Sequence, residues 1–206
     1  MVKKLLSLSG RALLALSVLL ASLGVTAGAA KDYLAEKSAR DSGSLGQIVL
    51  ADTDFVMNSM RSAAPEKGWR ATDGDPQLVY TQQMMFTGVK FYMEYSMYPG
   101  EMLLYYTTQA QPRFSNANMA VIKPVKGEKG WFAVSLPATQ VTSLRIDPTV
   151  TAGNHLVFGD FVVNPPQGFA AYLAPDAYTM LSTVVYSLVL FAILSFVKDF
   201  FTKNSK

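Results

Sequence analysis

The chain has 206 residues, half of them hydrophobic, and a formal net charge of +3. It contains no cysteine, which excludes disulfides, thiolate nucleophiles and cysteine metal sites. Positive charge is concentrated at the two ends, because residues 31–178 hold 12 basic and 14 acidic residues. The sequence therefore excludes a broad basic surface, and we predict no nucleic-acid partner.

The first thirty residues have the pattern of a signal sequence. Lys3, Lys4 and Arg11 precede an uncharged stretch, Ala12–Ala30, which ends in Ala27-Gly28-Ala29. A basic lead, an apolar core and a small-residue end are typical of a cleaved signal peptide. Nineteen uncharged residues also nearly span a bilayer, so an uncleaved signal-anchor helix is the alternative. Both interpretations place the residues that follow outside the cytoplasm.

Residues 31–73 are predicted to be a polar linker with short elements of structure. Gln47–Leu50 has the composition of a short strand. Asp52-Thr53-Asp54 offers an N-cap to a short helix, on which Phe55, Val56 and Met60 would share one face.

Residues 74–164 read as successive antiparallel strands. Runs of β-branched and aromatic residues are separated by Gly, Pro or Asn, as in Val89–Met97 and His155–Val163. About eight such runs in this space predict a jelly-roll-like β-sandwich, so the fold class is mainly β. Alternation along the first run places Phe91, Met93, Tyr95 and Met97 in the core.

The chain ends in a second apolar segment. Residues 165–177 form a juxtamembrane segment, in which Pro175 suits the first turn of a helix. Residues 178–197 are uncharged and long enough to cross a membrane, and residues 198–206 form a basic tail with Lys198, Lys203 and Lys206. The basic residues at both ends predict a bacterial inner-membrane protein with a cytoplasmic C-terminus and a periplasmic middle domain.

Several short motifs of the middle domain occur in a familiar order. Trp69 precedes Asp75-Pro76-Gln77-Leu78, Phe114-Ser115-Asn116 follows Tyr105-Tyr106, and Leu144-Arg145-Ile146-Asp147-Pro148 comes after Leu136-Pro137. Over residues 69–163 this resembles the extracytoplasmic jelly-roll domain of bacterial polytopic membrane glycosyltransferases and other surface-polysaccharide biosynthesis proteins. The resemblance implies a sandwich with a role in glycan handling. It does not imply transferase activity, because the chain has at most two membrane helices and no catalytic module.

Arg145 and Asp147 share one face of a predicted strand, because they are two residues apart. They are candidates for hydrogen bonds to sugar hydroxyls, and the alternative, which we favour, is a structural ion pair.

Aromatic side chains are the other candidates for binding a glycan or a partner. An aromatic ring with a polar tip can stack on the apolar face of a sugar or pack against another protein. The candidates are Trp69, Tyr92, Tyr98, Tyr106 and Trp131. The methionines fit core packing better than a copper site, and no motif for a cofactor or a metal is present, so we predict none.

These observations favour a non-enzymatic accessory in envelope polysaccharide biogenesis, in which the sandwich binds a glycan or a protein. The alternative is an interaction subunit of another inner-membrane complex, with the lipid bilayer and a membrane protein as partners. A third interpretation is a small periplasmic hydrolase. His155 is the only histidine and no Gly-x-Ser-x-Gly motif occurs, so the sequence offers little for that chemistry.

Overall fold

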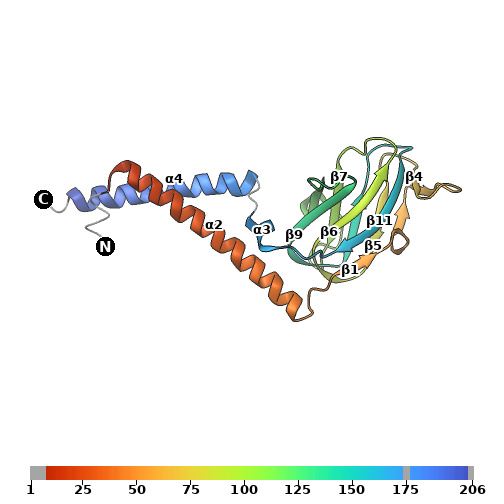
Figure 1. Cartoon of the computed structure of the whole chain (residues 1–206), viewed down its shortest axis with the longest axis horizontal. Helices are drawn as coiled ribbons and strands as arrows, with labels where there is room; N and C mark the ends of the chain where they lie inside the picture. Colours follow the sequence, from red (N-terminus) through yellow and green to blue (C-terminus); the bar gives the residue numbers. More distant parts are fainter. Residues whose placement is uncertain (1–7, 174–176, 204–206) are drawn as a thin grey trace. The chain divides into compact units, whose positions relative to one another are not determined.

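The computed structural model describes residues 8–173 and 177–203 and divides into two compact units. A helical unit comprises residues 1–38 and 167–206, and a β unit comprises residues 39–166 (Figure 1). The α-helices are α2 (Gly10–Asp41), α3 (Phe169–Leu173) and α4 (Ala177–Lys203). The strands are β1 (Ile48–Leu50), β2 (Val56–Asn58), β3 (Met60–Ser62), β4 (Trp69–Ala71), β5 (Gln77–Tyr80), β6 (Met84–Tyr95), β7 (Met102–Thr107), β8 (Met119–Pro124), β9 (Trp131–Val141), β10 (Ser143–Asp147) and β11 (His155–Val163).

The helical unit holds two helices, α2 and α4, that are long and apolar enough to cross a membrane. Helix α2 does not stop at residue 30 but continues unbroken through Ala27-Gly28-Ala29 to Asp41. Two buried serines, Ser17 and Ser187, donate hydrogen bonds to the carbonyls four residues earlier in their own helices. Their hydroxyls are therefore satisfied without water, as an apolar environment requires.

Helix α3 packs on the polar end of α2. The ring of Tyr33 lies 5.3 Å from that of Phe169 and 5.6 Å from that of Tyr172. The Tyr172 hydroxyl also donates a hydrogen bond to Glu36. Lys3, Lys4, Pro175 and Lys206, on which part of the membrane prediction rests, lie outside the described residues.

The strands of the β unit form one continuous antiparallel sheet that folds into two layers. The order is β2-β5-β10-β7-β8-β9-β6-β11-β4-β3, and β1 pairs with β11 beside β4. Strand β8 pairs with β7 over residues 119–122 and with β9 only at Lys123 and Pro124, where the sheet passes from one layer to the other. The predicted mainly β, sandwich-like fold is confirmed.

The core between the layers follows the predicted alternation only over part of β6. Phe91 and Met93 are fully buried, whereas Tyr95 and Met97 are more than 40% exposed. The alternation ends because β6 stops at Tyr95 and Met97 belongs to the loop that follows. That loop forms one wall of the site described below.

Most of the segment expected to be a linker, residues 39–73, is part of the β unit, whereas residues 31–38 belong to the helical unit. The predicted helix over Phe55 to Met60 is wrong, because a single 3₁₀ turn at Asp52–Asp54 is followed by strands β2 and β3. Strand β2 pairs with β5 and β3 with β4, so main-chain pairing overrides the local helical spacing. Only Ser59, in the left-handed region at φ 53°, separates the two strands. The β unit therefore begins well before residue 74.

Candidate functional site

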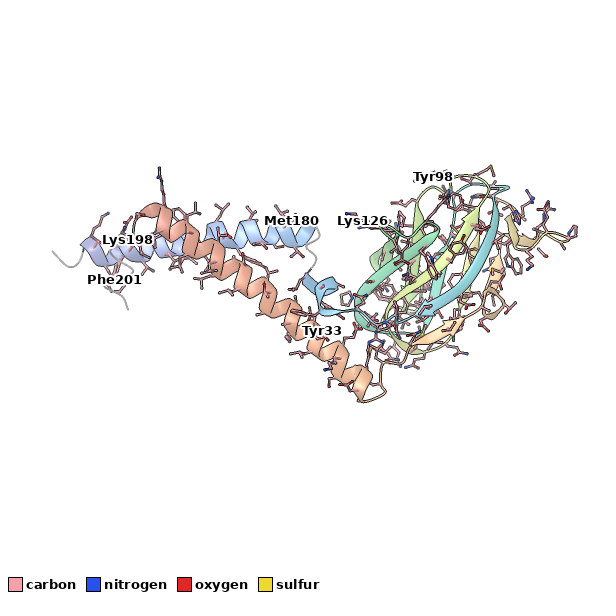
Figure 2. The ribbon with its side chains drawn as sticks, in the orientation of Figure 1. Tyr33, Tyr98, Lys126, Met180, Lys198 and Phe201 are labelled. Carbon is pink, nitrogen blue, oxygen red and sulfur yellow. The ribbon has the colours of Figure 1, made fainter. Side chains whose placement is uncertain are left out.

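An open trough of about 710 Å³ lies at one end of the β unit. One wall is the β6–β7 loop, and the other is the end of β8 together with the β8–β9 hairpin, residues 125–130. In Figure 2, Tyr98 labels the first wall and Lys126 labels the tip of the hairpin. The floor consists of the core residues Met102, Ile122 and Phe132, so it is apolar.

Tyrosines and charged groups line the upper part of the trough. Tyr98 is 78% exposed and Tyr95 is 42% exposed, although both rings border a concave surface. Charged side chains from both walls surround them: Glu101, Lys123, Glu128 and Lys129. A trough with an apolar floor, aromatic walls and a few polar groups on its rim has the composition and size of a small-ligand site.

The β6–β7 wall is fixed by the buried side chain of Asn154. Its Nδ2 donates to the Met97 carbonyl at 2.8 Å and to Thr149 Oγ1 at 3.2 Å, while its Oδ1 accepts from the Met97 N–H at 3.0 Å. Thr149 Oγ1 in turn donates to the Pro99 carbonyl at 2.9 Å. The Tyr98 carbonyl accepts from Thr151 Oγ1 at 3.2 Å. The main chain on both sides of the Tyr98 ring is therefore held before a ligand binds.

The hairpin wall is held against the outer face of β6 and β9. Lys90 Nζ lies 2.7 Å from Glu128 Oε2 and 4.9 Å from the centre of the Trp131 ring. The Tyr92 ring packs edge-on against Trp131 at 5.8 Å. Tyr92 also donates to Glu94 Oε1 at 2.8 Å, and this hydrogen bond raises the pKa of the phenol. Tyr92 and Trp131, both predicted site residues, therefore support the hairpin from outside the trough.

Gly130 allows the hairpin to approach Tyr92. Its φ is +79°, and a Cβ there would lie 2.5 Å from the Tyr92 ring. Gly127, in the same hairpin, has a φ of +83° and open space around its Cβ position. Both glycines thus have a left-handed backbone conformation, but only at Gly130 would an added Cβ meet a neighbouring side chain.

We expect Gly130→Ala to destabilise the β unit by about 1–2 kcal/mol more than Gly127→Ala does. Both substitutions put alanine in a left-handed backbone conformation, but only the Gly130→Ala methyl group would clash with the Tyr92 ring. Equilibrium chemical unfolding of the full chain, followed by Trp fluorescence, measures the difference. Equal destabilisation of the two variants would show that the Tyr92 contact does not hold the hairpin.

Besides Tyr92 and Trp131, the structure places Trp69, Tyr106, Arg145 and Asp147 outside the trough. Trp69 lies on β4 and is separated from Tyr95 by Leu156 of β11, which pairs with both. Its Nε1 donates to Asp52 Oδ2 at 2.7 Å. Tyr106 is partly buried and packs against the core, because it shares the inward-facing side of β7 with Leu104. Arg145 lies on the outer face of β10, where its cross-strand neighbour on β7 is Tyr105.

Arg145 and Asp147 form the ion pair that the sequence favoured. Arg145 Nε and Nη2 each lie 2.7 Å from a carboxylate oxygen of Asp147, and Nη2 also contacts Asp75 Oδ1 at 2.8 Å. The guanidinium stacks over Tyr105 with its centre 5.0 Å from the ring. Burial raises the pKa of Asp147, although the hydrogen bonds from Arg145 oppose this effect. Both carboxylate oxygens of Asp147 and Oδ1 of Asp75 already accept from Arg145, so the ion pair is formed in the unliganded protein.

Sequence reasoning missed several residues that build the trough. Tyr95 was assigned to the core by alternation, and Asn154 belongs to no motif. Lys123 and Lys129 lie in a segment whose charges and glycines are typical of an exposed hairpin tip. A signal was present only for the turns: Pro99-Gly100 and the glycines of the hairpin mark the two loops that become the walls.

No family model matches the sequence, and no curated protein does. Among solved structures, the β unit is similar to a xylan-binding module, CBM86, from Roseburia intestinalis, with a TM-score of 0.38 and 10% identity over 62% of this chain and 98% of that one. It is also similar to the C-terminal CBM6 of LamC from Zobellia galactanivorans, with a TM-score of 0.35 and 7% identity over 57% and 99%. A third is a carbohydrate-binding module of Cellvibrio mixtus lichenase 5A in complex with cellotriose, with a TM-score of 0.33 and 12% identity over 58% and 98%. The likeness is distant and is one of fold; the link to glycosyltransferases stays a prediction.

Proposed function

We propose that the trough binds a glycan and that the protein is a membrane-anchored, non-enzymatic accessory in bacterial envelope polysaccharide biogenesis. The observation that carries the proposal is the pair of exposed tyrosines, Tyr95 and Tyr98, held over an apolar floor by clamped main chain. Here both walls are fixed by hydrogen bonds and ion pairs before binding.

A sugar ring matches this arrangement because it has an apolar C–H face and a rim of hydroxyls. The tyrosine rings supply stacking surfaces, while the carboxylates of Glu101 and Glu128 accept hydrogen bonds from hydroxyls. Lys123 and Lys129 donate to sugar oxygens. Because the walls are already ordered, binding costs little conformational entropy in the protein.

The two apolar helices support membrane anchoring. Helix α2 continues eleven residues past Ala30 without a break and packs on α3, which favours the signal-anchor alternative over cleavage. With both ends of the chain in the cytoplasm, the β unit lies in the periplasm. The small serine and threonine side chains along α4 allow a second membrane helix to approach closely, and such a membrane protein is the partner that an accessory subunit requires.

The test uses the full chain in lipid nanodiscs and a panel of neutral and acidic envelope oligosaccharides, with affinities measured by isothermal titration calorimetry. We expect Tyr98→Ala to weaken binding of the best ligand at least tenfold, about 1.4 kcal/mol, because it removes the most exposed stacking ring. Tyr98→Phe keeps the ring and should retain most of the affinity.

Val56→Ala is the matched control, since Val56 is an exposed apolar side chain on the outer face of β2, outside the trough. Its affinity should equal that of the wild type. Failure of the wild type to bind any member of the panel, or equal affinities for Tyr98→Ala and wild type, contradicts the proposal.

A further inference from the structure

A row of basic side chains crosses the outer face of three neighbouring strands. Arg61 on β3 stands directly opposite Arg70 on β4, and Arg70 stands opposite His155 on β11. Their sequence neighbours Ala71 and Leu156 are buried in the core, so the row itself faces outward.

This arrangement is unfavourable in the isolated protein. Like charges directly opposite each other on adjacent strands destabilise a sheet, and acidic partners are the usual solution. Among the described residues only Glu66 forms ion pairs in the row, at 3.9 Å from Arg70 Nη2 and 3.7 Å from His155 Nδ1, and its side chain is 64% exposed. Arg61 forms no ion pair with a described residue, and Lys67 adds another positive charge in the same turn.

The row is nevertheless held in place. Arg70 Nη1 donates to the Gly153 carbonyl at 3.3 Å. His155 Nε2 lies 2.7 Å from the Lys67 carbonyl, which can only accept, so Nε2 carries a proton. The turn that brings Lys67 there depends on Gly68, whose φ is +98° and whose Cβ position is 2.3 Å from the Leu156 carbonyl oxygen.

The row runs directly into the trough wall. Ser96 continues it on the next strand position, since its N–H donates to the His155 carbonyl and its Oγ accepts from the His155 N–H, both at 3.0 Å. Tyr98 follows Ser96 by two residues in the same loop, whereas Tyr95 turns to the opposite face and packs on Phe132. A ligand long enough to follow the β6–β7 loop from Tyr98 past Ser96 therefore reaches His155 and then Arg70.

We propose that Arg61 and Arg70 bind an anionic group, a carboxylate, phosphate or sulfate, on the same glycan that occupies the trough, so that the ligand is an acidic polysaccharide. This rests on the proposed function. The anion supplies the negative charge that the three-strand row lacks, and an arginine fork binds any of these groups with two parallel hydrogen bonds.

The experiment compares charged and neutral forms of the same polymers, using the full chain in phosphatidylcholine nanodiscs at 50 mM and 200 mM salt. The pairs are polygalacturonate with its methyl ester, and dextran sulfate with dextran. We expect at least one anionic polymer to bind at least tenfold more tightly than its neutral form at 50 mM salt, and the difference to shrink at 200 mM salt. The pair that discriminates identifies a carboxylate or a sulfate-like group.

Arg61→Gln with Arg70→Gln should reduce affinity for the anionic polymer to that of its neutral form and leave neutral-polymer affinity unchanged. Arg61→Gln alone should weaken binding of the anionic polymer about threefold. Because it breaks no ion pair among the described residues, this single variant keeps the test valid if the double variant unfolds. Arg113→Gln, an exposed arginine in the β7–β8 connection, is the control and should change nothing.

Equal binding of charged and neutral polymers by the wild type, or unchanged discrimination in the arginine variants, overturns this inference. Failure of the proposed function has a different signature. There Tyr98→Ala leaves the affinities for the neutral polymers unchanged, whatever the arginine variants do.

Discussion

Asn154→Ala is expected to lower the free energy of unfolding of the β unit by about 3 kcal/mol and to weaken glycan binding at least tenfold. The Asn154 side chain is fully buried and satisfies both the N–H and the carbonyl of Met97. Alanine leaves these main-chain groups and Thr149 Oγ1 without their partner, and each such loss costs about 1–3 kcal/mol. The loop that carries Tyr98 then loses its attachment to the β10–β11 connection.

Chemical unfolding and calorimetric titration of the same full-chain preparation separate the two effects. Asn58→Ala is a suitable control because Asn58 is exposed on β2, and its stability should stay within about 0.5 kcal/mol of the wild type. If Asn154→Ala binds glycan with wild-type affinity while remaining folded, the clamped loop is not part of the binding site.

Arg145→Met is expected to destabilise the β unit by about 3 kcal/mol at pH 7, at the lower end for a buried pair because the Arg145 side chain is 20% exposed. The variant leaves Asp147, with a side chain only 11% exposed, beside the carboxylate of Asp75 without a cation. The pKa of Asp147, already raised by burial, then rises further because the opposing hydrogen bonds are gone.

The pH dependence of this destabilisation follows from the raised pKa of Asp147. A carboxyl with a raised pKa in the folded state binds a proton more tightly there than in the unfolded chain, so stability falls as pH rises through the folded pKa. The loss in Arg145→Met should therefore shrink as the pH falls from 7 through the raised pKa of Asp147, because the carboxyl then becomes neutral. Arg113→Met is the matched control, because it removes an arginine that forms no ion pair with a described residue. A deficit independent of pH would indicate lost packing on Tyr105 instead of an unpaired charge.

The elements with strong periodicity could be predicted from the sequence. The alternation of Phe91 and Met93 in β6, and of Leu144 and Ile146 in β10, gives the correct inward faces. The second apolar helix also begins and ends near its predicted limits, residues 178–197 against Ala177–Lys203. These features depend on local spacing, which a single sequence contains.

The trough could not be predicted, because it is built from residues distant in the sequence. Tyr98 and Gly130 line one trough only through the order of β6, β9 and β8, and Asn154 acts on Met97 across fifty-seven positions. Tyr92 and Trp131 were candidates because an aromatic ring with a polar tip can stack on a sugar, but their register as cross-strand neighbours makes them a support for the hairpin. Burial and register, rather than residue type, decide which aromatic rings meet a ligand.

Amide hydrogen exchange of the full chain in nanodiscs, with and without the best-binding oligosaccharide, tests most directly whether the trough is the binding site. The structure predicts slower exchange on binding in residues 95–102 and 125–130, and no change in β2 or β5, which do not line the trough. Protection confined to the outer face of β2, β5 and β10, with the two loops unchanged, would contradict it.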